Sequence, residues 1–327
     1  VDGDAEPVRK VTVEREMIVE TGTPQDDRLN ATLWAQQAVE YKATTDGIYA
    51  LAAMRLDEAL ADPDWTAAPD LQGEAYQDLP PAIILDADET VLDNSPYAAA
   101  GILAGEDYNS DSWNEWARDG VAKAVPGAVD FTRAAAARGV KVFYVTNRDA
   151  GVEAGTARNL AALGFPMGGN VDTLLTKGEQ ADWTSAKSTR WAVVAADYRV
   201  LLMLGDNLGD FTDSYKGSPA ERQVVYEANQ DKWGREWIAL PNPGYGSWES
   251  DLALTARGTA VADYVEQVQP CFADLPDGYA FDAHMEQEFL RLVNTARKEE
   301  GLSALIYRPA LRNTARFHSL DMAYNDF

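Results

Sequence analysis

The segment Ile83–Thr90 constrains the fold most, because an apolar run rich in β-branched residues ends there in two aspartates, Asp86 and Asp88. Such a run is typical of a buried parallel strand, and ligands bind beyond the carboxyl ends of these strands. The spacing would let Asp86 attack phosphorus while holding a cation, and let Asp88 pass a proton to and from the leaving oxygen. The alternative interpretation is a strand followed by a solvated acidic turn.

A second apolar run, residues 141–145, also ends in polar side chains, here Thr146 and Asn147. A hydroxyl and an amide at a strand tip can bind phosphate oxygens without adding charge. The alternative is a polar turn with Arg148 in water.

One lysine and two further aspartates extend the pattern. Lys187 stands at the expected start of a helix that reaches about residue 196, where a cation suits an anion site, and Lys177 competes for this role. A third apolar run, residues 200–204, is followed by Asp206 and Asp210. More carboxylates at a neighbouring strand tip would repel the first pair unless a cation lay among them. Hard oxygen ligands indicate Mg²⁺.

With these motifs in order, the chain resembles the haloacid dehalogenase superfamily of phosphohydrolases. More narrowly it resembles the class C bacterial acid phosphatases, the surface-lipoprotein 5′-nucleotidase family, over about residues 28–268. The narrower resemblance rests on Leu33–Gln37, Glu40–Tyr41, Asp86–Tyr97, Trp113–Trp116, Pro126–Val129, Gly205–Asn207 and Pro241–Glu249. It implies an α/β fold with a Rossmann-like parallel sheet flanked by helices. An insertion at about residues 96–125 would form a small, largely helical cap.

The resemblance also implies a role for each site residue. Asp86 would be the nucleophile and Asp88 the acid/base, with the Asp86 carboxylate, the Asp88 main-chain carbonyl and Asp206 binding Mg²⁺. Asp210 would hold a water of the metal, although Leu208 and Gly209 precede it where the family usually has two acidic residues close together. The phosphoryl group would be bound by Thr146, Asn147 and Lys187.

Two aromatic residues are candidates for substrate recognition. The resemblance places Trp113 and Tyr245 as a clamp that stacks on a nucleobase or another aromatic leaving group, and stacking contributes about 1–3 kcal/mol per base. The alternative is packing in the cap or core, which we expect for Trp116.

Composition limits the partners and the location. The formal net charge of −25 argues against a nucleic-acid polymer or an anionic membrane as partner. Cys271 is the single cysteine, so an intrachain disulfide is excluded, and no run is long and apolar enough to span a membrane. The chain begins at Val1, so we expect that a leader has been removed and that the protein is secreted, periplasmic or attached to the cell surface. A homodimer is left open.

Three further segments flank the phosphatase-like region. Residues 1–27 form an acidic segment, in which residues 8–19 alternate like a peripheral strand. Residues 269–280 have the composition of a linker, and residues 281–327 begin with apolar residues at helical spacing. This last stretch resembles the truncated start of a CAP (SCP-like) extracellular domain, on Asn294–Arg297 and Ala315–Ala323. Both histidines, His284 and His318, lie in it, which argues against a histidine nucleophile.

We therefore expect a magnesium-dependent phosphomonoesterase of the acid phosphatase or 5′-nucleotidase type. Its substrates would be nucleoside monophosphates or aryl phosphates, hydrolysed through an aspartyl-phosphate intermediate. One alternative is a phosphotransferase on the same site. Another is a non-catalytic surface protein that displays the CAP-like module.

Overall fold

The computed structural model describes residues 26, 28–250 and 283–299. The chain divides into two compact units, residues 1–252 and 253–327, which are described separately. The described part of the second unit is the helix α11 (Ala283–Glu299), where apolar residues recur at helical spacing. The expected strand at residues 8–19, the linker at 269–280 and residues 300–327 lie outside the described residues.

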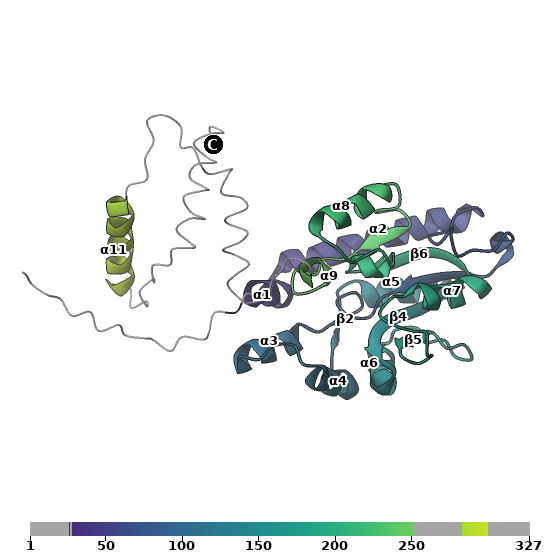
Figure 1. Cartoon of the computed structure of the whole chain (residues 1–327), viewed down its shortest axis with the longest axis horizontal. Coiled ribbons are helices and arrows are strands. Elements are labelled where there is room, and N and C mark those ends of the chain that lie inside the picture. The colour runs from purple at the N-terminus through teal and green to yellow at the C-terminus, as the bar shows by residue number, and fades with distance from the viewer. Residues whose placement is uncertain (1–25, 27, 251–282, 300–327) are drawn as a thin grey trace, which may run out of the picture. The chain divides into compact units, whose positions relative to one another are not determined.

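A parallel sheet of five strands forms the centre of the first unit, in the order β5–β4–β1–β6–β7. Figure 1 labels β4, β5 and β6 of this sheet. Strand β1 is central because both of its neighbours pair with it in parallel, with Ile84 opposite Phe143 on one side and Met203 on the other. The strands are β1 (Pro81–Leu85), β4 (Lys141–Asp149), β5 (Leu174–Lys177), β6 (Arg199–Gly205) and β7 (Trp237–Ala239). The expected α/β fold with a Rossmann-like parallel sheet is confirmed.

Alternating side chains of the strands form two hydrophobic cores, one on each face of the sheet. Ile83 and Leu85 of β1 belong to one core, whereas Ala82 and Ile84 belong to the other. Both faces are therefore dry, and this explains why the sequence of β1 is apolar throughout and does not alternate with polar residues.

Helices cover both faces. One core packs against α2 (Val39–Ala61), α5 (Ala128–Ala137) and α6 (Glu153–Leu163), and the other packs against α7 (Ser188–Asp197). Two helices, α1 (Leu29–Gln37) and α2, follow one another here, because Ala38 adopts an extended conformation between them. The other elements outside the sheet and the cap are η1 (Tyr76–Asp78), η2 (Ala150–Val152), η3 (Leu208–Asp210), α8 (Pro219–Ala228) and α9 (Ser247–Ser250).

The insertion after β1 forms the cap, which consists of the helices α3 (Ser95–Ala104) and α4 (Ser110–Asp119) and a ribbon of β2 (Leu92–Asp93) with β3 (Lys123–Ala124). Helix α4 packs closely on α6 at Gly155, where an added Cβ would lie 2.6 Å from the Cα of Arg118. The backbones meet there because residue 155 has no side chain, so this glycine sets how near the cap helix lies to the sheet domain.

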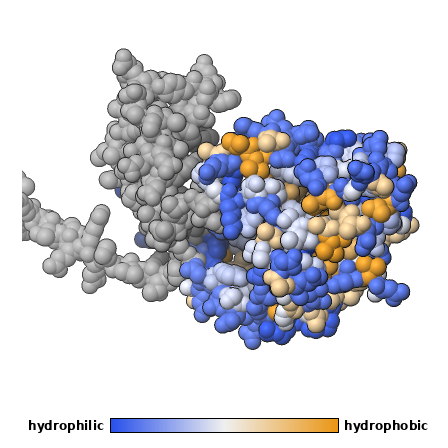
Figure 2. Space-filling view, turned by 45° about the vertical axis from the view of Figure 1, so that its right-hand side comes forward, coloured by the Kyte–Doolittle hydropathy of each residue, from blue (hydrophilic) through white to orange (hydrophobic). Residues whose placement is uncertain are grey.

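The surface of the described residues is largely hydrophilic on the face that Figure 2 presents, with apolar residues in smaller patches. Among the described helices, none has the length and the apolar composition needed to cross a membrane.

Candidate active site

A cavity of about 730 Å³ lies where the carboxyl ends of β1, β4 and β6 meet. This is the edge at which parallel α/β sheets bind ligands. Eight of the nine residues that the sequence assigned to the site line this cavity: Asp86, Asp88, Trp113, Asn147, Lys187, Asp206, Asp210 and Tyr245.

Three carboxylates and one ammonium group form the floor of the cavity. Carboxylate oxygens of Asp86, Asp206 and Asp210 lie within 4.8 Å of one another. The Nζ atom of Lys187 is 2.5 Å from Asp86 Oδ1 and 2.7 Å from Asp210 Oδ1, and it also donates to the main-chain oxygen of Val145 at 2.7 Å. Lys187 is 2% exposed, so the charge pairs are shielded from water.

The electrostatics of this floor favour a cation. Burial raises the pKa of Asp86 to about 7, and the neighbouring Asp210 and Asp88 add to the rise against the opposing charge of Lys187. Burial, Asp210 and Asp86 likewise raise the pKa of Asp206 well above its ordinary value. Burial disfavours the charged form of Lys187, but Asp210 and Asp86 outweigh it and raise the pKa of Lys187 to about 12. The lysine therefore stays charged, while Asp86 and Asp206 ionise less readily than exposed aspartates do.

The donor set fits a hard divalent cation. When all three carboxylates are ionised, they exceed the one ammonium by two negative charges, which one Mg²⁺ would neutralise. Asp206 is oriented by the Thr90 hydroxyl, which donates to its Oδ1 at 3.0 Å, and by Asn242 Nδ2, which donates to its Oδ2 at 2.8 Å. Such outer hydrogen bonds fix the direction in which a ligating carboxylate points.

Asp210 belongs to the floor even though Leu208 and Gly209 separate it from the residues that directly follow β6. The short helix η3 returns it toward β6, and its Oδ2 accepts a hydrogen bond from the Asn207 amide at 2.8 Å. An added Cβ at Gly205 would lie 2.2 Å from the Cβ of Asp210, so the residue that ends β6 has to be a glycine.

The residues expected to bind phosphate differ in their exposure. Thr146 is fully buried and does not line the cavity, and its hydroxyl accepts a hydrogen bond from the Arg148 amide at 3.1 Å. A hydroxyl that accepts one bond still has its own proton to donate. Asn147 lines the cavity and donates to the Ser185 carbonyl at 3.1 Å. Of the two competing lysines, Lys187 lies in the floor, whereas Lys177 pairs with Asp149 at 2.9 Å.

The described geometry agrees with a family comparison. Residues 5–248 match the family model described as HAD superfamily, subfamily IIIB, acid phosphatase. The chain belongs to this acid phosphatase family. It is thereby placed among the phosphoric monoester hydrolases, and the expected membership of the haloacid dehalogenase superfamily is confirmed. The match ends at residue 248, so the CAP-like resemblance of residues 281–327 stays a prediction.

Solved structures support this acid phosphatase assignment. The class C acid phosphatase from Bacillus anthracis is 31% identical, with a TM-score of 0.59, over 78% of this chain and 98% of its own. A structure of the class C acid phosphatase from Bacillus anthracis with tungstate bound is 30% identical, with a TM-score of 0.60 and the same coverage.

Two curated relatives are more distant. The stem 28 kDa and stem 31 kDa glycoproteins of Glycine max are each 24% identical over 139 residues, or 41% of this chain. The chain spans about half the length of these relatives, 54% of the first and 47% of the second.

Two residues that no sequence pattern assigned to the site, Arg148 and Asn94, hold Asp88 in place. Arg148, which one interpretation left in water, is 1% exposed, and its Nε and Nη2 lie 2.9 and 2.8 Å from Asp88 Oδ1. Asn94 Nδ2 donates to the same oxygen at 2.9 Å. Side chains alternate between the two faces of a strand, so a strand that continued beyond Val145 would have Thr146 and Arg148 on the same face. This alternation was the signal in the sequence that could have placed Arg148 in the site.

The clamp candidates lie at the mouth of the cavity. Trp113 is half-buried on α4, and its ring meets Tyr97 edge-on at a centroid distance of 5.1 Å. Tyr245 is 41% exposed and its hydroxyl donates to Glu89. Glu89 has φ of 53°, a strained conformation for a residue with a side chain, and such strain is common at functional sites.

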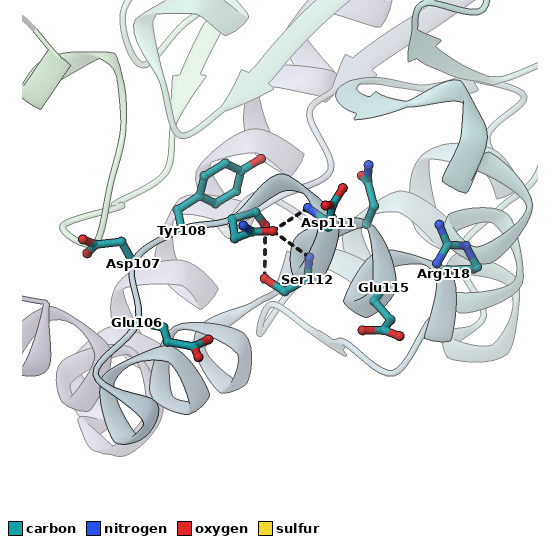
Figure 3. Close-up of a pocket in the computed structure, with 9 residues that line it drawn as sticks. Glu106, Asp107, Tyr108, Asp111, Ser112, Glu115 and Arg118 are labelled. Carbon is teal, nitrogen blue, oxygen red and sulfur yellow. Dashed lines mark hydrogen bonds between the residues drawn. The ribbon is translucent and has the colours of Figure 1, made fainter.

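A second hollow, of about 780 Å³, lies around the start of α4 (Figure 3). Its polar groups serve the helix end, because Asn109 Oδ1 accepts from the amides of Asp111 and Ser112 at 2.8 and 3.2 Å. None of the site residues that the sequence assigned to catalysis, phosphate binding or metal binding lines it.

Proposed function

We propose that this acid phosphatase is a magnesium-dependent phosphomonoesterase that uses Asp86 as its nucleophile. The observation that carries the proposal is the placement of Asp86 at the tip of β1, bonded to Lys187 and within 4.8 Å of the Asp206 and Asp210 carboxylates. The relative with tungstate bound supports it, because tungstate is a tetrahedral oxyanion like phosphate.

In the first half-reaction, a carboxylate oxygen of Asp86 attacks phosphorus in line and forms an aspartyl-phosphate. The bond from phosphorus to the leaving oxygen breaks, and Asp88 donates a proton to that oxygen. In the second half-reaction, Asp88 takes a proton from water, whose oxygen attacks phosphorus. Inorganic phosphate leaves and Asp86 is regenerated.

Other residues stabilise the charge that moves during both steps. Lys187, Thr146 and Asn147 would bind the phosphoryl oxygens, and donors fixed before the reaction stabilise the transition state most. Mg²⁺ would be held by the Asp86 and Asp206 carboxylates and the Asp88 main-chain carbonyl, with Asp210 acting through water. When bound, it would neutralise charge on the transferring group.

The substrates we propose are nucleoside monophosphates or aryl phosphates. Trp113 and Tyr245 both line the cavity that contains the aspartates, which supports their contact with an aromatic group attached to the phosphate. Their contact involves the part of the substrate that does not react, so it would set affinity more than chemistry.

The location and assembly remain proposals as well. The class C resemblance supports a secreted, periplasmic or surface-attached protein, and it leaves a homodimer open. The net charge of −25 supports a small phosphomonoester over a nucleic-acid polymer as the partner.

Replacing the nucleophile tests the proposal. Asp86→Asn should lower phosphate release from a nucleoside monophosphate by about a thousandfold or more, because an amide cannot attack phosphorus. The matched control is Asp57→Asn, which removes an exposed carboxylate that pairs with Arg138 on the surface. EDTA should abolish wild-type activity, and Mg²⁺ should restore it. A sizeable residual rate in Asp86→Asn would rule out the covalent mechanism, and phosphate transfer to added alcohol would indicate the phosphotransferase.

A further inference from the structure

Asn94 joins the cap to the acid/base Asp88 through its side-chain amide. It is 3% exposed and precedes α3, between the loop that follows β1 and the cap. Its Oδ1 accepts from Trp116 Nε1 at 2.9 Å and from Arg148 Nη2 at 3.1 Å. Its Nδ2 donates to Asp88 Oδ1 at 2.9 Å. One amide therefore connects the cap helix α4, strand β4 and Asp88.

The orientation of this amide follows from its partners. An indole N–H and a guanidinium can only donate hydrogen bonds, so both must face the oxygen of the Asn94 amide. Turning the amide over would place its NH₂ against two donors and leave Asp88 facing an oxygen. Trp116 and Arg148 together thus force Nδ2 toward Asp88.

The same reasoning distinguishes the two oxygens of Asp88. Oδ1 faces Asn94 Nδ2 at 2.9 Å, Arg148 Nε at 2.9 Å and Arg148 Nη2 at 2.8 Å. All three neighbours are donors, so a proton placed on Oδ1 would point at another hydrogen. A proton that Asp88 carries therefore belongs on Oδ2.

We infer that Asn94 is a positioning residue that presents Oδ2 of Asp88 to the leaving oxygen, and that Trp116 fixes Asn94 from the cap. The inference rests on the proposed function, in which Asp88 protonates the leaving group. Asn94 also lines the cavity, but in this inference it acts through its hydrogen bond to Asp88 and not on the substrate. Trp116, expected from the sequence to be a packing residue, packs partly against the main core and also serves this network.

Leaving-group dependence separates this role from a structural one. A misplaced general acid harms esters of weakly acidic phenols, whose leaving oxygen needs the proton, more than esters of acidic phenols. We would measure kcat/KM for phenyl phosphate and ring-substituted phenyl phosphates, including para-nitrophenyl phosphate. These esters are of similar size, so contact with the aromatic rings at the mouth changes little across the series.

Asn94→Ala should lower kcat/KM for phenyl phosphate about tenfold more than for para-nitrophenyl phosphate, which steepens the leaving-group dependence. Trp116→Phe keeps an aromatic ring but removes the indole N–H that donates to Asn94, and it should steepen the leaving-group dependence by a smaller factor. The matched control is Asn109→Ala, which removes the N-cap of α4 without touching Asp88 and should lower all esters by one common factor.

The outcomes are decisive in both directions. A steeper leaving-group dependence in Asn94→Ala supports the inference. If Asn94→Ala does not fold, Trp116→Phe serves as the test variant in its place. An unchanged dependence in the variant that folds overturns it. Asp86→Asn keeps the two proposals apart. Residual activity in Asp86→Asn would contradict the proposed role of Asp86 as nucleophile. If Asp86→Asn is inactive and Asn94→Ala leaves the leaving-group dependence unchanged, only the proposed role of Asn94 is contradicted.

Discussion

The floor of the cavity and the cap above it are held in place by different forces. The floor comprises Asp86, Asp206, Asp210 and Lys187, which are fixed by strands in register and by buried charge pairs. The cap rests on a backbone contact at Gly155 and on a few hydrogen bonds. Strand ladders and buried ions allow little adjustment, whereas a single helix contact can shift with one added methyl group. The residues proposed for phosphoryl transfer thus lie on the rigid part, whereas Trp113, one of the two residues proposed for substrate choice, lies on the adjustable part.

The largest effect should come from the floor. Lys187→Met leaves buried carboxylates without their ammonium, and breaking a buried pair costs about 3–5 kcal/mol. We expect a loss near the low end of that range in the free energy of unfolding in EDTA, because the carboxylates can take up protons. We also expect phosphate release to fall by about a hundredfold or more. Denaturant unfolding and an activity assay would measure both.

Lys177→Met is the matched control for this change. Lys177 and Asp149 form a pair in which both side chains are more than a third exposed, and such pairs contribute at most about 1 kcal/mol. Equal losses in the two variants would mean that the floor is not the distinct buried cluster described above.

The mouth of the cavity should give an intermediate effect that depends on substrate. Trp113→Ala or Tyr245→Ala should raise KM for a nucleoside monophosphate about tenfold, from a stacking contribution of about 1–3 kcal/mol. KM for a small aliphatic phosphate should change little, because that substrate has no ring to stack. If both substrates lost the same factor, the two rings would be packing residues and not a clamp.

The contact between cap and sheet domain should give the smallest effect on activity. Gly155→Ala places a Cβ 2.6 Å from the Arg118 backbone, so α4 has to move outward. We expect kcat/KM for a nucleoside monophosphate to fall a few-fold and stability to fall by about 1–3 kcal/mol, the usual cost of overpacking. Gly151→Ala is the control, because no atom lies within 4 Å of its added Cβ. Full activity in Gly155→Ala would show that the position of the cap is not critical.

The same contrast explains what the sequence could predict. The floor was predictable because its carboxylates directly follow apolar runs, and the ends of parallel strands must meet at one edge of the sheet. Lys187 was placed correctly at the start of a helix, since it immediately precedes α7. Strands β5 and β7 were not singled out, because runs of four and three residues give little periodicity.

Contacts between distant segments were the part that the sequence could not provide. Arg148 lies 60 residues from Asp88, and Trp116 lies 22 residues from Asn94. No local pattern tells which donor reaches which acceptor across such separations. A buried arginine looks the same in sequence as a solvated one, because burial is decided by the cap that covers it.

The bonding of Lys187 has a consequence for the order of events. An ammonium has three protons, and here Asp86, Asp210 and the Val145 carbonyl accept all of them. A phosphoryl oxygen can accept a hydrogen bond from this lysine when one of those three acceptors loses its own hydrogen bond to Nζ. If that acceptor is Asp86, the arrival of the substrate would free the oxygen that we propose attacks it, and the proposed nucleophile would stay hydrogen-bonded to Lys187 until a phosphoryl group is present.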